Sequence, residues 1–161
     1  MRALSFFVGG ELFAIDVTLV EKVSRRMIVT PIPTAPDAVI GITNMKGKVV
    51  TLFNLHELLG HTERRSDKRT FETINAIIFK AVAGDEAQMG LSIEKPGELI
   101  YISDDIVCSP AQVTGTEESF CITGIAELNN RLYRIVDIVS IINKYKTRGQ
   151  KTAENISGGG Y

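Results

Sequence analysis

The residues with the clearest potential for chemistry are two histidines, His56 and His61, which bound the segment HELLGH. The segment resembles a zinc protease signature, in which two histidines four residues apart bind the metal and a glutamate acts as base. Here the spacing is five residues, which turns the second imidazole about 140° away around a helix. Gly60 would also end a helix before His61. We therefore expect two surface histidines and no metal site.

A second candidate is the segment GITNMKGKV, residues 41–49, which resembles a phosphate-binding loop. That loop has four residues between its glycine and Gly-Lys, then Ser or Thr for Mg²⁺, and it opens a helix. This segment has five residues in between, Val49 follows Lys48, and a strand pattern continues from there. We interpret the segment as a glycine-dependent β-turn and expect no cofactor.

A third candidate is the basic stretch from Arg64 to Arg69, which could bind nucleic acid together with Arg25-Arg26. The stretch has no aromatic residues at stacking spacing, and the net charge of −1 gives no global attraction to DNA. We expect a solvated connector, and a small-barrel nucleic-acid-binding module is kept as the alternative function. No nucleophile with a partner base is recognisable, so enzymatic activity is not expected.

Length and composition indicate one compact domain, since the chain has 161 residues of which 44% are hydrophobic and 23% charged. The N-terminal apolar run is too short for a signal peptide and soon meets Glu11 and Asp16. No run approaches the roughly 20 apolar residues that span a bilayer, so we expect a cytoplasmic protein. Cys108 and Cys121 form no CxxC motif; a disulfide is one alternative, and two buried free thiols are the expected one.

The secondary structure around these residues is indicated by a pattern that occurs twice in the sequence. Residues 41–60 read GITNMKGKVVTLFNLHELLG and residues 124–143 read GIAELNNRLYRIVDIVSIIN, at a constant offset of 83 (124 − 41) without a gap. Only Gly-Ile is identical, but chemical type is kept, for example between Asn54 and Asp137. Repeated supersecondary units specify architecture, so we expect two similar β-rich halves.

Short apolar runs separated by glycine, asparagine and proline favour small barrels over a parallel sheet. Tight turns are expected at Gly9-Gly10, Lys46-Gly47 and Asn129-Asn130, and an interruption at Pro96-Gly97. The expected strands are 3–8, 12–16, 40–44, 48–53, 73–81, 89–93, 99–102, 120–127 and 131–137, and the expected short helices are 17–23 (with Asp16 as N-cap), 55–59 and 138–144. The expected core is Phe6, Val8, Phe13, Ile15, Ile40, Ile42, Val50, Leu52, Leu55, Leu58, Ile77, Phe79, Leu91, Ile93, Ile122, Ile125, Leu132, Ile135 and Ile138.

From end to end, the sequence resembles the CheW family of chemotaxis coupling proteins over about residues 3–144. The fragments that carry this resemblance are, in order, FFVGGELFAID, LVEKV, PIPTAPDAVIGITNMKGKVVTLFNLHELLG, MGLSIEKPGELIYI and GIAELNNRLYRIVDIVSIIN. The third is similar to the family's signature run around a Gly-x-x-Asn-hydrophobic-Arg-Gly turn. Each fragment is weak alone, but their order is specific.

The resemblance implies an all-β protein with two SH3-like five-stranded barrels packed around a shared hydrophobic core. It implies a single domain over residues 1–146, with lobes of roughly 1–66 and 67–146 that either keep or exchange strands; the polar residues 147–161 are expected to form a mobile tail. It also implies a non-enzymatic adaptor without cofactors. Its expected partners are the tips of methyl-accepting chemoreceptors and the regulatory domain of a CheA-type histidine kinase, in the cytoplasm beside membrane receptor arrays.

Receptor-binding positions implied by the resemblance are Val20, Lys22, Gly41 and Lys46. The family commonly has an acidic residue in place of Lys22 and arginine in place of Lys46. Lysine keeps the charge at position 46 but loses the planar fork of arginine, and Glu21 lies next to Lys22. Lys22 is therefore either a binding residue or an unpaired surface lysine of little energetic weight.

A shallow apolar groove edged by Val20, Val23 and Ile42 could accept a receptor helix, and the alternative is that all three belong to the core. The family usually carries Val-Asp-x-Val near residues 92–96. Glu94 and Pro96 depart from that pattern, so we assign no binding site to this segment.

Overall fold

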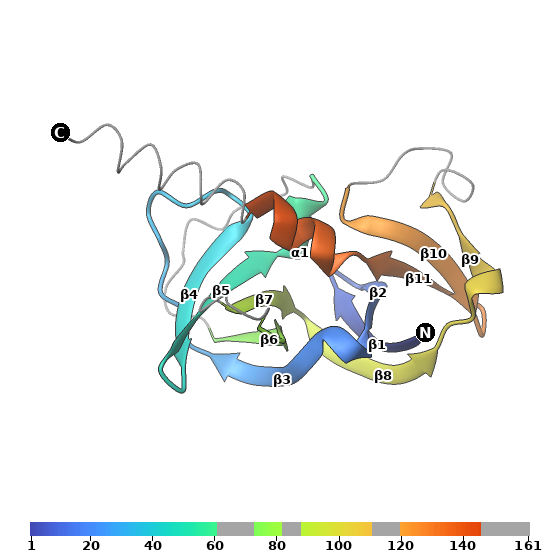
Figure 1. Cartoon of the computed structure of the whole chain (residues 1–161), viewed down its shortest axis with the longest axis horizontal. Coiled ribbons are helices and arrows are strands. Elements are labelled where there is room, and N and C mark those ends of the chain that lie inside the picture. The colour runs from blue at the N-terminus through green and yellow to red at the C-terminus, as the bar shows by residue number, and fades with distance from the viewer. Residues whose placement is uncertain (61–72, 82–87, 111–119, 146–161) are drawn as a thin grey trace.

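The computed structural model describes residues 1–60, 73–81, 88–110 and 120–145, and its regular structure is mostly β (Figure 1). The strands are β1 Arg2–Val8, β2 Glu11–Asp16, β3 Val20–Met27, β4 Val39–Met45, β5 Lys48–Asn54, β6 Ile74–Phe79, β7 Gln88–Ile93, β8 Lys95–Tyr101, β9 Val107–Cys108, β10 Ile122–Leu128 and β11 Arg131–Val136. The helical segments are η1 Val17–Leu19, α1 Leu55–Leu58, η2 Asp104–Ile106 and residues 138–145. The all-β prediction is confirmed.

The strands form two sheets that lie side by side as two lobes (Figure 1). The six-stranded sheet, barrel 1, has the order β8-β1-β2-β11-β10-β9, and β8 leads through η2 into β9 at its other end. The five-stranded sheet, barrel 2, has the order β3-β6-β7-β5-β4, and a bridge between Thr30 and Ile42 joins its two ends. Each sheet therefore closes on itself. Barrel 1 counts six strands because η2 divides its closing strand into β8 and β9.

At two points, strands that are consecutive in the chain belong to different barrels. β3 follows β2 through η1 but belongs to barrel 2, whereas β8 follows β7 directly but belongs to barrel 1. Sheet membership thus changes twice along the chain: barrel 2 is the continuous run β3–β7, which separates the two parts of barrel 1. It does not follow a division into residues 1–66 and 67–146. The expected tail, residues 147–161, lies outside the described residues.

The pattern that occurs twice in the sequence forms the same unit in each barrel. β4, β5 and α1 begin at Val39, Lys48 and Leu55, and β10, β11 and the helix of residues 138–145 begin 83 residues later. The residue before each helix caps it, because Asn54 Oδ1 accepts from the backbone N–H of His56 and Asp137 Oδ1 from that of Ser140. The prediction of two similar β-rich halves is confirmed.

The main hydrophobic core lies between the barrels, and the helix of residues 138–145 (orange-red in Figure 1) adds Ile138 and Ile141 to it. Each barrel also encloses a smaller cluster of its own. Most of the expected core is buried, but Leu132 is 53% exposed. Side chains alternate along a strand, so Leu132 and Ile135, three apart on β11, cannot both face the inside of barrel 1. Tyr133 and Ile135 are buried there, and Val136 is buried in the core between the barrels.

Two local predictions were wrong. β8 runs through Pro96-Gly97 without the expected interruption, because it is an edge strand whose ladder with β1 already shifts register between Leu4 and Phe6. Neither cysteine forms a disulfide, but only Cys121 is buried, whereas Cys108 is exposed on the short strand β9. In the part of the chain that the structure describes, no helix is long and apolar enough to cross a membrane.

Candidate functional site

Val20 and Lys22 lie on β3, at one edge of the barrel 2 sheet. The ladder with β6 pairs Val20 with Phe79 and Lys22 with Ile78, so Glu21 is an extra residue, a β-bulge. The bulge brings Val20 and Val23 to the same face although they are three residues apart. That spacing therefore reflects a bulged strand, and the predicted helix over residues 17–23 is limited to η1, where Asp16 is the N-cap as expected.

Burial separates the apolar residues of β3 from the charged one. Val20 and Val23 are half-buried and pack against the core between the barrels, while Lys22 is exposed. Within the described residues, Lys22 has no ion pair or hydrogen bond from its side chain. The two valines thus combine contact with the core and access from outside, and Lys22 lies exposed beside them.

Gly41 is buried in β4 at the point where barrel 2 closes. A Cβ atom built on it would lie 2.3 Å from the backbone oxygen of Thr30. Thr30 and Ile42 exchange backbone hydrogen bonds of 2.8 and 2.9 Å at the same place. Only glycine permits this approach, so Gly41 holds the closure of the barrel, and Ile42 next to it is half-buried.

Lys46 is exposed in the turn between β4 and β5. Lys46 and Gly47 both have left-handed backbone angles, with φ of 51° and 79°, and Asn44 Oδ1 accepts from the backbone N–H of Gly47 at 3.0 Å. These are the angles of a primed hairpin turn. The interpretation of this segment as a β-turn is confirmed.

All of the predicted site residues lie on barrel 2, but they belong to two strands and a turn. Val20, Lys22 and Val23 lie on β3, whereas Gly41 and Ile42 lie on β4 and Lys46 follows it. The Thr30–Ile42 bridge connects the chain that leaves β3 to β4. Val20 and Val23 pack against the core between the barrels. Ile42 is half-buried, and the two lysines are exposed.

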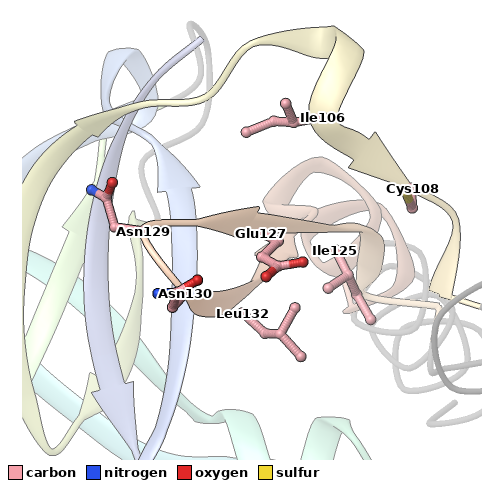
Figure 2. Close-up of a pocket in the computed structure, with 7 residues that line it drawn as sticks. All are labelled: Ile106, Cys108, Ile125, Glu127, Asn129, Asn130 and Leu132. Atoms are coloured by element: carbon pink, nitrogen blue, oxygen red, sulfur yellow. The ribbon is translucent and has the colours of Figure 1, made fainter.

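A depression that the sequence analysis missed lies on barrel 1, between η2–β9 and the β10–β11 hairpin (Figure 2). Its volume is about 490 Å³, and it is lined by Ile106, Cys108, Ile125, Glu127, Asn129, Asn130 and Leu132. At the offset of 83 residues, Ile125 and Asn129 correspond to Ile42 and Lys46. The depression therefore occupies on barrel 1 the place that the β4 residues occupy on barrel 2. Two of its exposed members, Cys108 and Leu132, are residues that the sequence predicts to be buried.

The described residues add no support for a nucleic-acid site or a zinc site. The stretch from Arg64 to Arg69 and His61 lie outside the described residues, and Arg25 and Arg26 are exposed on β3. His56 is half-buried, and its imidazole lies over Gly9, where an added Cβ would be 2.3 Å from His56 Cε1. Among the described residues, no three side chains of histidine, cysteine, aspartate or glutamate gather as metal ligands.

The two closed sheets with their shared core and repeated hairpin–helix unit correspond to one known family. A family model described as a CheW-like domain matches residues 2–146. The chain belongs to the CheW-like family. Among curated relatives, it is similar to "Chemotaxis protein CheW" of Treponema pallidum, with 28% identity over 138 residues that cover 85% of this chain and 79% of the relative. The protein of that name from Rhizobium meliloti is 25% identical over 139 residues, or 86% of this chain and 84% of the relative.

A solved structure agrees with this family at the level of the fold. The crystal structure of the scaffolding protein TtCheW from Thermoanaerobacter tengcongensis matches with a TM-score of 0.67 and 25% sequence identity. The match covers 84% of this chain and 88% of that protein. The resemblance to CheW on which the fold was predicted is therefore confirmed.

Proposed function

We propose that this protein is a non-enzymatic adaptor of chemotaxis signalling, which couples chemoreceptor tips to the regulatory domain of a CheA-type histidine kinase. The observation that carries this proposal is the CheW-like domain over residues 2–146, which spans both barrels. Relatives matched over most of their length are named chemotaxis protein CheW, and the matched crystal structure is of a scaffolding protein. Such an adaptor would work in the cytoplasm, held at membrane receptor arrays by its partners.

The receptor site of this proposal is the outer edge of barrel 2. Val20 and Val23, half-buried on β3, supply apolar contact, and Lys22 and Lys46 supply exposed positive charge. Gly41 contributes through the closure of the barrel, since a larger residue would collide with Thr30. Ile42, half-buried beside it, extends the apolar edge.

An adaptor changes kinase activity only if its contacts with the receptor differ in free energy between signalling states. Contacts of this kind are modest singly, and an array multiplies them because linked binding events raise the effective concentration of each partner. The half-buried valines of β3 and the exposed lysines Lys22 and Lys46 suit that requirement, as each contributes a small, adjustable interaction rather than a deeply buried anchor.

The test is calorimetric titration of the full chain with the isolated regulatory domain of a CheA-type kinase from the same organism. We expect saturable one-to-one binding. A parallel titration with single-stranded and duplex oligonucleotides at low salt addresses the alternative function, since electrostatic binding is strongest there. A folded protein that ignores the kinase domain, or that binds the oligonucleotides instead, would overturn the proposal.

Lys22→Glu tests the receptor site. Reversing an exposed charge should change the affinity for a receptor cytoplasmic fragment by about two- to fivefold at low salt, and added salt should reduce the difference. The measurement is calorimetry at two salt concentrations, with Arg131→Glu on barrel 1 as a control of equal charge change. Unchanged receptor affinity at low salt would remove Lys22 from the site.

A further inference from the structure

A buried side-chain amide lies against β3 at Glu21, between Val20 and Lys22 of the proposed receptor site. Gln88, the first residue of β7, is only 6% exposed. Its Nε2 donates one hydrogen bond to Glu21 Oε2 on β3 and another to the backbone oxygen of Phe79 at 3.3 Å. Both donors of the amide are therefore used, as the burial of a polar group requires.

Packing alone does not explain a glutamine at this place. In the parallel ladder of β5 and β7, Gln88 pairs with Val50, which belongs to the apolar cluster inside barrel 2 together with Leu52 and Ile78. An apolar side chain would fill the position without the desolvation cost of an amide. What the amide adds is the hydrogen bond to Glu21, which is 67 residues away in the sequence.

Glu21 is the bulged residue of β3, between Val20 and Lys22. Bulges re-aim side chains, and here the bulge places the carboxylate of an exposed residue against the buried amide. Gln88 is a neutral donor, so it holds the carboxylate without cancelling its charge. Within the described residues, Glu21 has no salt bridge.

We propose that Glu21 is a specificity-determining residue of the receptor site and that Gln88 is the positioning residue that holds its carboxylate. The site then offers a fixed anion beside Val20 and the cation of Lys22, and it favours a helical partner segment with a basic side chain opposite Glu21. Because the free protein already holds the carboxylate in place, binding loses less side-chain entropy. This inference rests on the receptor-binding role proposed above.

The experiment uses the full chain and its variants Glu21→Gln, Gln88→Met and the double substitution. Glu98→Gln on β8 is the control, since it makes the same charge change on the edge strand of the other barrel. Calorimetry measures the affinity for a receptor cytoplasmic fragment and for the kinase regulatory domain. Thermal unfolding and the side-chain amide signals of Gln88 in NMR spectra report on the fold and on the contact.

We expect each single variant to bind the receptor fragment about two- to fivefold more weakly at low salt, as for one exposed charged contact. The double variant should be no weaker than the singles, because both changes remove the same interaction. Binding to the kinase domain should stay unchanged, as should both affinities of Glu98→Gln. Glu21→Gln should also shift the amide signals of Gln88.

Three results would overturn the inference. The first is unchanged receptor affinity in a folded Gln88→Met variant. The second is a loss of receptor affinity in the double variant that equals the product of the two single losses. The third is an equal loss of affinity for the receptor fragment and for the kinase domain, because a purely structural role would weaken both. If Gln88→Met does not fold, the Glu21→Gln variant still tests the inference, because Glu21 is exposed and its substitution should leave the fold intact. Unchanged receptor affinity in Glu21→Gln would refute the inference. A wild-type protein that does not bind receptor at all would instead remove the proposed receptor function, and this inference with it.

Discussion

At the scale of single residues, Val20 shows the partial burial that the proposed receptor site requires. Its side chain lies against the core between the barrels, yet it keeps an accessible side next to exposed Lys22. A fully buried residue could not contact a partner, and a fully exposed one would contribute little to stability. The sequence left open whether Val20 and Val23 belong to a groove or to the core. The structure shows both packed against the core and partly accessible, and the groove stays a prediction.

Val20→Asp should lower the free energy of unfolding by about 1–3 kcal/mol, because it places a carboxylate at the edge of an apolar cluster. We expect the variant to fold and to lose receptor binding. Denaturant unfolding and calorimetry measure the two effects. The matched control is Val139→Asp, at a valine that is 54% exposed, where stability should change by less than about 0.5 kcal/mol.

Either of two results would contradict this account of Val20. A variant that no longer folds would show that Val20 is entirely a core residue. A folded variant with normal receptor affinity would place Val20 outside the site.

At the scale of elements, short strands and their turns were predictable because turn chemistry is local. Gly9, Gly10 and Asn129-Asn130 all have left-handed angles, as their residue types suggested. The bulge at Glu21 was not predictable in the same way. An extra residue in β3 is defined only by its ladder with β6, and in the sequence alone Val20 and Val23 have the spacing of a helix.

The two helix caps lead to a prediction at this scale. Asn54→Ala and Asp137→Ala should each lower the free energy of unfolding by about 1 kcal/mol, since each removes the acceptor of backbone N–H groups at a helix start. Chemical denaturation measures the change. Asp105→Ala serves as control, because this exposed residue lies inside η2, where no side chain makes a capping hydrogen bond. A change no larger than that of the control would mean that the caps carry no stability.

At the scale of the whole molecule, we expect the two barrels to fold in one event, because barrel 2 (β3–β7) lies in the chain between the two parts of barrel 1. Barrel 1 takes β1 and β2 from the start of the chain and its other strands from the second half, while β3 leaves for barrel 2. The largest core cluster includes residues of both barrels. Neither half of the chain can therefore complete a barrel.

We expect the full chain to unfold in one cooperative transition, with circular dichroism and tyrosine fluorescence giving the same midpoint. Residues 1–66 and 67–146, expressed separately, should each remain unfolded, because each lacks strands of both barrels. Heteronuclear NMR of the fragments, alone and mixed, is the check. Two separate transitions, or a half that folds alone, would show that the barrels are independent units.

The turns, the repeated hairpin–helix unit and the membership of the CheW-like family could be predicted from residue types, because all of these depend on short or fixed spacing. The folded structure was needed to show which strands close each barrel, why Gly41 must be glycine, and that Gln88 donates to Glu21. It also decided that Leu132 and Cys108 face outward. These features depend on contacts between segments far apart in the chain, and local periodicity carries no information about which distant segments will meet.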